Sequence, residues 1–498
     1  MLLSLLIILP LLNAIALLPC KRQTQVRTIA AAGAALQFAL AFFLLFQYSQ
    51  QRMNGNTDAM VFQEDYTWFA ALNIHYFVGV DGISISMILL TAFVVLAAVL
   101  VSWTIDKMYK EFFVLLMLLS AGAYGFFISL DLFTLFFFLE VAVIPKFLLI
   151  GVWGSGKKEY SAMKLALMLM LGLALVFVGL AGLYFNSASP GGLHTFNLLE
   201  IAKSNIPVEV QQFFFPFAFV GFGIFSALFP FHTWVPDGHS SAPTAASMFL
   251  AGISMKLGGY GCLRVATFLM PDAAHAYAPV IILLATIAII YGAFATMMQT
   301  DLKYINAYSS VSHCGFVLLG IGMLTQTSVN GAVLQMVSHG LMTALFFAAI
   351  GMLYARTHTR EVARLGGLLK VTPFISTVFV IAGLCSLGLP GLSGFVAEMT
   401  VFMGAWQNPD KWYRLATILA CASIVVTAVY ILRAAGKTIM GPLSSTYAHL
   451  TDATWNEKLA AGVLIVAIMA IGIAPFWLND LIQPGTTIVM QKVLSLNS

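Results

Sequence analysis

Residues 135–154 read LFFFLEVAVIPKFLLIGVWG, and this stretch decides the class of fold. Its twenty residues are long and apolar enough to cross the hydrocarbon core of a bilayer as one helix. Glu140, Pro145 and Lys146 nevertheless lie in its middle. An ionisable side chain at that depth costs at least about 2.5 to 3.5 kcal/mol, so it generally faces protein or water and has a function. The stretch therefore predicts a membrane helix with a polar interior face.

The composition of the whole chain is that of an integral membrane protein. Of its 498 residues, 60% are hydrophobic and only 9% are charged, whereas roughly a quarter are charged in a soluble domain. Apolar runs of about 17 to 25 residues predict an all-α membrane protein with about fourteen spans. These are expected near 2–19, 27–47, 81–103, 111–130, 131–153, 161–185, 211–233, 242–268, 276–297, 303–324, 328–355, 372–406, 412–436 and 455–478. The chain 1–498 is thus predicted to be a single membrane domain, with a short element in each of the long connections 48–80 and 186–210.

The basic residues predict the orientation, because loops rich in Lys and Arg stay on the cytoplasmic side. Connections after odd-numbered spans hold sixteen of the 24 Lys and Arg residues, and connections after even-numbered spans hold four. Both chain ends are therefore expected on the outer side of the membrane.

Several kinds of site are not predicted. The net charge of +4 follows from the basic loops, and no basic patch interleaves with aromatic residues, so nucleic acid is excluded as a partner. No glycine-rich phosphate-binding motif occurs. The five cysteines stand singly, without metal-ligand spacing. We therefore expect no cofactor and no metal in this chain.

Six ionisable residues are expected inside spans, and they form a candidate proton path. A buried Glu–Lys pair can move a proton because the protonation of each partner depends on the other, and histidine, with a pKa of about 6.5, suits the middle of a relay. A structural interpretation remains for each residue, since a buried histidine often only bonds a neighbour and Lys256 lies among small residues that favour close helix packing. The six are Glu140, Lys146, Lys256, His313, His339 and Glu398.

Three further residues are candidates for access or gating. Asp131 begins span 5, where an Asp commonly caps a helix, and a place on the proton path is the alternative. His232 and His239 flank the interruption of span 7 and could gate access from the cytoplasm.

Prolines interrupt three of the expected spans. A proline leaves the carbonyl four residues earlier without its helical partner and lets the helix kink. On a straight helix Glu140 and Lys146 would lie about 120° apart, and the kink is expected to turn both toward one hydrated interior. The breaks are expected at Pro145 in span 5, Pro230 and Pro236 in span 7, and Pro390 in span 12.

Spans 7 and 12 are five spans apart and therefore have opposite orientations. Matching interruptions at this offset suggest inverted repeats, a transporter design in which broken helices line a polar path. The alternative is that Pro and Gly are simply common in membrane helices.

Five stretches carry a resemblance to a known family. Together they resemble the antiporter-like proton-pumping subunits of respiratory NADH:quinone oxidoreductase, and the likeness covers almost the whole chain. The stretches are FFFLEVAVIP (136–145), PFHTWVPDGHSSAPTAASMFLAGISMKLGGYG (230–261), DLKYINAYSSVSHCGF (301–316), MVSHGLMTALFF (336–347) and LPGLSGFVAE (389–398).

The resemblance implies a domain organisation and a role for each candidate. It implies N-terminal spans over 1–110, inverted five-helix repeats over 111–268 and 276–436, and a C-terminal loop and last span over 437–498. A hydrated axis would run along the membrane midplane. Glu140 would be the key glutamate, Lys256 the central lysine, His313 and His339 the histidines of the second half, and Glu398 the outlet residue.

The resemblance also implies partners. Flavin, iron–sulfur clusters and quinone would belong to other subunits, and this chain, as part of a translocase without a redox centre of its own, would carry protons only. Its neighbours would be the antiporter-like subunits L and N, with lipid around them, in a bacterial cytoplasmic membrane.

One position departs from the family pattern. The family has a lysine about nine residues before the Trp of the HxWxPD motif, and that lysine pairs with the glutamate of span 5. Here the position is Phe225. Lys146 is the unassigned buried lysine near Glu140, so we expect Lys146 to have taken over the missing partner's role.

Two other functions remain as alternatives. A cation/proton antiporter or a membrane hydrogenase-linked subunit would share the architecture but use the polar axis for ion exchange. A haem held between His313 and His339 would make the chain an embedded redox enzyme.

Overall fold

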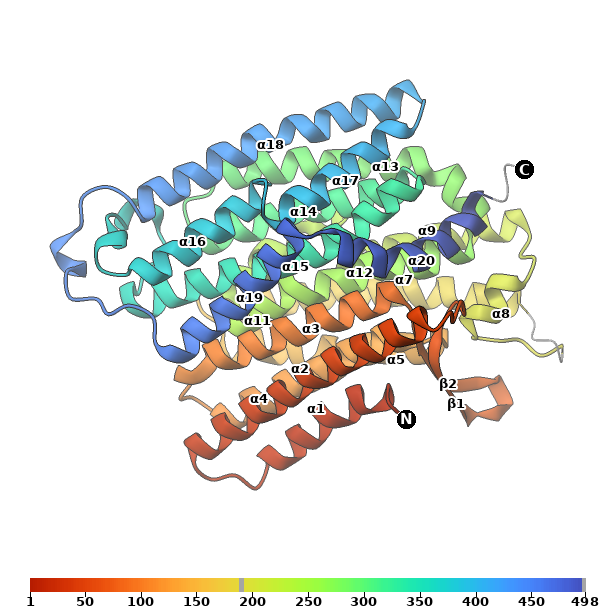
Figure 1. Ribbon diagram of the computed structural model, residues 1–498, viewed down its shortest axis with the longest axis horizontal. Coiled ribbons are helices and arrows are strands. Elements are labelled where there is room, and N and C mark those ends of the chain that lie inside the picture. The colour runs from red at the N-terminus through yellow and green to blue at the C-terminus, as the bar shows by residue number, and fades with distance from the viewer. Residues whose placement is uncertain (188–191, 495–498) are drawn as a thin grey trace.

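Helices make up most of the computed structural model, which describes residues 1–187 and 192–494 (Figure 1). Within these described residues, ten helical segments are long and apolar enough to cross a membrane. The chain is therefore a mostly helical membrane protein, as its composition predicts. The ten segments are α2 (Gln23–Met53), α3 (Gly82–Val101, extended to Thr104 by a 3₁₀ turn), α4 (Tyr109–Ile128), α5 with α6 (Leu132–Val141 and Val143–Trp153), α7 (Lys158–Phe185), α9 (Val208–Phe225), α13 (Pro271–Met297), α15 (Gln326–Thr357), α18 (Lys411–Thr438) and α19 (Trp455–Ile473).

The other helices are shorter, less apolar or interrupted. Two π-helical segments, η4 (Leu250–Ser254) and η5 (Cys262–Thr267), flank one of them, α12. These helices are α1 (Ser4–Leu17), α8 (Leu198–Lys203), α10 (Trp234–Ser241), α11 (Thr244–Phe249), α12 (Met255–Gly261), α14 (Leu302–Gly322), α16 (Pro373–Ser386), α17 (Ser393–Gln407) and α20 (Phe476–Leu494).

The two ends of the helix bundle differ in what they carry. The N-terminus and the last turn of α20 lie toward one end of the bundle, as do α8 and the antiparallel hairpin of β1 (Val61–Phe69) and β2 (Ile74–Val80) (Figure 1). We call this the terminal end. The opposite end, which we call the basic end, carries the loops 18–22, 102–108, 357–372 and 439–454, of which the first three hold Lys21, Arg22, Lys107, Arg360, Arg364 and Lys370. The hairpin and α8 are the short elements expected in the two long connections.

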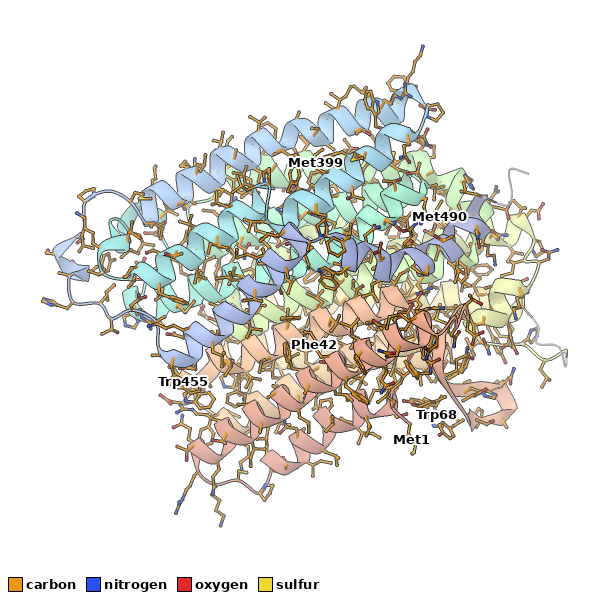
Figure 2. The ribbon with its side chains drawn as sticks, viewed as in Figure 1. Met1, Phe42, Trp68, Met399, Trp455 and Met490 are labelled. Atoms are coloured by element: carbon orange, nitrogen blue, oxygen red, sulfur yellow. The ribbon has the colours of Figure 1, made fainter. Side chains whose placement is uncertain are left out.

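Large apolar side chains cover the outside of the bundle. Trp68 and Trp455 are both exposed and lie toward opposite ends of it, while exposed Phe42 and Met399 lie between them (Figure 2). Exposed tryptophans at two levels with apolar residues between them are typical of a membrane protein with an aromatic belt at each interface.

Aspartates cap the helices that position the candidate site. Asp131 accepts hydrogen bonds from Phe133 N and Thr134 N at the start of α5, and Asp301 accepts bonds from Lys303 N and Tyr304 N at the start of α14. The backbone N–H groups of a first helical turn lack helical partners, so each carboxylate fixes the point where its helix begins.

The interruptions fall near the predicted prolines. The run that contains Pro145 breaks one turn earlier, at Ala142, because Pro145 cannot bond the Val141 carbonyl. Pro230 lies in the break between α9 and α10, and Pro390 lies between α16 and α17. Pro236 was wrongly predicted to be a break: it lies in the first turn of α10, where its missing N–H costs nothing.

The last span is longer than predicted. Instead of ending at residue 478, the chain breaks after Ile473 and continues as α20. Gly472 packs directly against the backbone of Gly391 and Leu392 in the break of α16 and α17, where any larger side chain would collide. The two interruptions therefore contact each other near the outer surface of the bundle, where Gly391 is exposed.

A short two-stranded bridge occurs twice in the fold. Asp131 pairs with Asn197 at the terminal end, and Asp301 pairs with Glu361 at the basic end, each through an antiparallel bridge. Asp131 caps α5 and pairs with the loop that follows α7. In the same way, Asp301 caps α14 and pairs with the loop that follows α15. The matching bonds are Leu132 N to Phe196 O (2.9 Å) and Leu198 N to Leu130 O (2.8 Å), and Leu302 N to Arg360 O (3.0 Å) and Val362 N to Thr300 O (2.9 Å).

The ends of α9 and α16 also repeat one local structure. The second residue after each helix has a positive φ. This residue is Ala227 after α9, at 57°, and Gly388 after α16, at 73°. In both cases, three consecutive backbone N–H groups donate to the carbonyl oxygens that lie four, three and five residues earlier in the chain. They are Ser226 to Phe222, Ala227 to Ile224 and Leu228 to Gly223, and Leu387 to Gly383, Gly388 to Cys385 and Leu389 to Leu384.

Candidate functional site

Four of the six predicted ionisable residues form one continuous chain in the interior. Lys256 Nζ donates to His339 Nδ1 at 2.9 Å, and the rings of His339 and His313 stack with centroids 5.2 Å apart. His313 Nδ1 lies 3.3 Å from Glu398 Oε1. All four side chains are at least 95% buried. The chain therefore offers a run of groups that can each accept and release a proton.

Glycines allow the helices of this chain to approach one another. A Cβ on Gly340 of α15 would lie 2.7 Å from the carbonyl oxygen of Gly252, which places the backbones of α15 and η4 in direct contact. Because of this contact, Lys256 can reach His339. Lys256 also donates to Ala251 O at 2.5 Å, in the π-helical turn before it. Such turns are frequent at functional sites.

Polar groups hold the other end of the chain. His313 Nε2 lies 3.0 Å from Ser386 Oγ, in the last turn of α16, and Gln335 Nε2 lies 3.3 Å from His313 Nδ1. Glu398 is on α17, beyond the break that Pro390 accompanies. The break brings Gly388 against the Glu398 carboxylate. The interruption of the span thus gives Glu398 its place beside His313.

Replacing Gly388 with alanine should disturb Glu398. The new Cβ would lie 2.7 Å from Glu398 Oε2, and its positive φ would be strained, at a cost of about 1–3 kcal/mol. We expect a lower melting temperature of the solubilised protein and a lower rate of proton translocation in membrane vesicles.

Gly391→Ala is the matched control. Gly391 also has a positive φ, of 93°, but its added Cβ would meet no atom within 4 Å. It should share the loss of stability and keep the translocation rate. An equal loss of translocation in both variants would contradict a specific effect on Glu398.

Glu140 and Lys146 do not share one interior, and the predicted geometry is wrong. Glu140 is exposed and lines an outward groove between α5, α6 and α7, with Val143, Ile144 and Phe147 among its apolar neighbours. Lys146 is 1% exposed and points into the bundle. No ion pair joins the two among the described residues. Packing of α4 against the break, with Gly122 touching Ala142, sets the rotation of the helix and keeps the two faces apart.

Lys146 instead lies beside Phe225. Its Nζ is 5.8 Å from the centroid of the Phe225 ring, a cation–π distance, and has no hydrogen-bond partner among the described residues. The ammonium of Lys146 therefore reaches the residue that replaces the lysine of the family pattern.

The gating candidates lie in different surroundings. Asp131 is buried and, besides capping α5, accepts a bond from His75 N of β2 at 3.1 Å, so its contacts are those of a structural residue. His232 stacks on Phe229, and its Nδ1 has no partner among the described residues. His239 is fully buried between Trp234 and Phe347, with both ring nitrogens unpartnered in the same part of the chain.

A polar cluster near the basic end was missed in the sequence. Lys164 Nζ lies 2.6 Å from Asp237 Oδ2, and Tyr304 donates to Asp237 Oδ1 at 3.3 Å. Buried Lys303 donates to Ala242 O at 2.6 Å. Lys164 and Lys303 stand near helix ends and were counted as orientation signals. The signal that could have found the cluster is Asp237, an acid between Pro236 and His239.

A second missed pair lies toward the terminal end. Arg264 of η5 forms a buried ion pair with Asp81, the N-cap of α3. Tyr260, one turn before Arg264, lies 3.0 Å from Ser84 Oγ. The pair fixes the start of α3 against the helix that carries Lys256.

The arrangement of the two histidines does not support the haem alternative. A haem iron held by two histidines would need the porphyrin between the rings, with one nitrogen of each ring directed at the metal. His313 and His339 instead stack on each other at an interplanar angle of 27°, and three of their four ring nitrogens lie near Ser386, Glu398 and Lys256.

Comparison with known proteins places this arrangement in a family. A family model described as "NADH:quinone oxidoreductase/Mrp antiporter, TM" matches residues 129–425. The chain is 39% identical to NAD(P)H-quinone oxidoreductase chain 4 3 of a Picosynechococcus species, over 86% of this chain and 78% of the relative. It is 35% identical to NADH-quinone oxidoreductase subunit M of Rickettsia bellii, over 95% of each chain.

A solved structure has the same fold. A chain of respiratory complex I from Thermus thermophilus, determined with bound NADH, superposes with a TM-score of 0.89 over 100% of both chains at 25% identity. The similarity thus extends to all the helices that position the buried chain of ionisable residues.

Proposed function

Because this chain belongs to the NADH:quinone oxidoreductase/Mrp antiporter transmembrane family, we propose that it translocates protons as subunit M of an NADH:quinone oxidoreductase. The observation that carries the proposal is the buried chain of Lys256, His339, His313 and Glu398, which touch or stack in sequence. A proton can pass along such a chain by small movements of side chains. Quinone reduction in partner subunits would drive it.

We propose fourteen spans arranged as two inverted repeats. Besides the ten long segments, α1, α11 to η5, α14 and α16 with α17 supply the remaining four. The repeated bridges at Asp131 and Asp301 support the repeats, because they lie at opposite ends of the bundle five spans apart. The repeated structure after α9 and α16 supports them independently. The repeats would cover 111–268 and 276–436, between N-terminal spans 1–110 and a C-terminal part 437–498.

Lys146 would serve as the lysine of the first repeat. Its ammonium lies at Phe225, on the interior side of the α5–α6 break. Glu140, on the outer face of the broken helix, would exchange protons with a neighbouring subunit. His232 and His239 would line the entry from the cytoplasm.

Glu140 also supports the proposed partners. A carboxylate on an apolar outer surface is costly in lipid, so the groove of α5, α6 and α7 is where we place another membrane subunit. The antiporter-like subunits L and N would flank this chain, with lipid elsewhere. Flavin, iron–sulfur clusters and quinone would lie in other subunits, and both chain ends on the outer side of a bacterial cytoplasmic membrane.

Glu140→Gln tests the function. We expect NADH-driven proton uptake into inverted membrane vesicles to fall by roughly tenfold or more, because a positioned proton-transfer group is typically worth that much. NADH oxidation with an artificial acceptor, which needs only the partner subunits, should be unchanged.

Glu159→Gln is the control, since Glu159 is exposed at the start of α7 near the basic end. Equal proton uptake in both variants would contradict the proposal. A rate of uptake that depends on Na⁺ would favour the cation/proton antiporter instead.

A further inference from the structure

The second repeat contains buried polar groups that the proton chain does not use. The side chains of Asn306, Ser376 and Thr438 are at least 99% buried on α14, α16 and α18. The two polar atoms of Asn306, Ser376 Oγ and Thr438 Oγ1 have no hydrogen-bond partner among the described residues. Buried polar atoms are costly unless bonded, and water is the usual partner where the protein supplies none.

Helix geometry places Ser376 opposite Thr438. Gly383 of α16 contacts Ile431 of α18. Seven residues are close to two helical turns, so Ser376 lies on the face of Gly383 and Thr438 on the face of Ile431, each roughly 10 Å nearer the basic end. The two helices are antiparallel neighbours, and the two hydroxyls therefore lie at the same depth on facing sides of the two helices.

Asn306 continues the line toward Glu398. It lies seven residues before His313 and hence on the same face of α14. His313 contacts Ser386, at the inner end of α16. Measured along the axis of the bundle, Asn306 therefore lies deeper than Ser376 and Thr438 and less deep than His313 and Ser386. Ser309, Ser310 and Tyr430 add buried hydroxyls between them, so successive polar groups are about one or two helical turns apart.

A surface pocket lies beside the outer end of this line, at the basic end, although Asn306, Ser376 and Thr438 do not themselves line it. The pocket is lined by Ile305, next to Asn306, and by Ala434 and Lys437, next to Thr438. Arg433 and Gln299 also line it, so its mouth is polar.

The first repeat provides an internal comparison. The bridges align Asp301 with Asp131 and thus Asn306 with Phe136. The helix ends align Leu387 with Ser226, and thus Ser376 with Phe215 and Ser386 with Phe225. Three polar positions of the second repeat are phenylalanine in the first. The polar line is therefore not a consequence of the fold, because the same fold has an apolar equivalent.

We propose that this line is a hydrated proton entry from the cytoplasm into the second repeat, which joins the buried chain at His313 and Glu398. The direction of proton flow rests on the proposed function, and the hydration does not. The route runs from the pocket past Thr438 and Ser376 to Asn306, and then past the hydroxyls of α14 and α18 to His313.

Cysteine labelling tests the route in membranes that contain the assembled complex. The parent carries Cys20→Ser and Cys421→Ser, which remove the two cysteines that are not buried. Ser376→Cys is compared with Ile375→Cys, a fully buried neighbour at the same depth on another face, and with Phe215→Cys, its counterpart in the first repeat. The probe is a small, charged, membrane-impermeant methanethiosulfonate.

We expect Ser376→Cys to react from the cytoplasmic face, in inverted vesicles, at least roughly tenfold faster than Ile375→Cys, because thiol reactivity follows exposure to water. Phe215→Cys should stay unreacted from the outer face, in right-side-out vesicles. Equal rates for Ser376→Cys and Ile375→Cys, or reaction of Ser376→Cys from the outer face only, would overturn the route. These outcomes do not depend on pumping, so they are separate from a failure of Glu140→Gln.

Discussion

Lys146→Met should abolish most NADH-driven proton translocation, and the double variant Lys146→Met with Phe225→Lys should recover it. The ammonium of Lys146 lies 5.8 Å from the Phe225 ring centroid, so a lysine at position 225 can put its charge in nearly the same volume. We expect a loss of roughly tenfold or more in the single variant. Proton uptake into inverted vesicles, with NADH oxidation followed in parallel, measures both changes.

Two controls define this test. Lys157→Met removes an exposed lysine at the start of α7 and should have no effect. Phe225→Lys alone should lower stability, because two ammonium groups would then compete for one buried volume. If Lys146→Met left translocation intact while Glu140→Gln abolished it, the relocation of the lysine would be disproved.

Lys256→Met should have an equally large effect, by breaking the chain at its first member. Lys256 is the buried group of α12 that contacts His339. Methionine fills a similar volume without a charge, so the helices should still pack. Translocation should fall by roughly tenfold or more, and NADH oxidation with an artificial acceptor should not change.

Lys370→Met is the control for this variant, since Lys370 is exposed near the basic end. Lys256→Arg separates charge from proton transfer. Arginine keeps the positive charge but does not release its proton in a protein, so it should fail like methionine. Full activity of Lys256→Arg would mean that the charge alone matters, and the relay through Lys256 would be disproved.

The members of the central chain could be named as candidates from the sequence because an ionisable residue within an apolar run is visible without a structure, but their mutual contacts could not. Lys256 and Glu398 each stand alone among apolar or small residues, and in the fold they are joined through His313 and His339. The outward position of Glu140 could not be predicted, since the rotation of a helix depends on its neighbours. Here that neighbour is Gly122 of α4 against Ala142.

Other residues were missed for chemical reasons. Lys303 and Lys164 lie near helix ends, where a basic residue usually reports orientation. Ser376 and Thr438 are hydroxyl residues, which in most helices bond their own backbone, so only the folded chain reveals that theirs do not. Helix α20 was missed because Asn479, Asp480 and Gln483 make its first turns too polar for a hydropathy search.

The stack of His313 on His339 limits how many charges the chain can hold. Lys256 is 2.9 Å from one ring and the second ring follows at 5.2 Å. Like charges so close together in a buried site repel strongly, so one added proton discourages a second. On the proposed route, protons would therefore pass one at a time, because a charged Lys256 would oppose protonation of His339 until the previous proton had moved from His313 to Glu398.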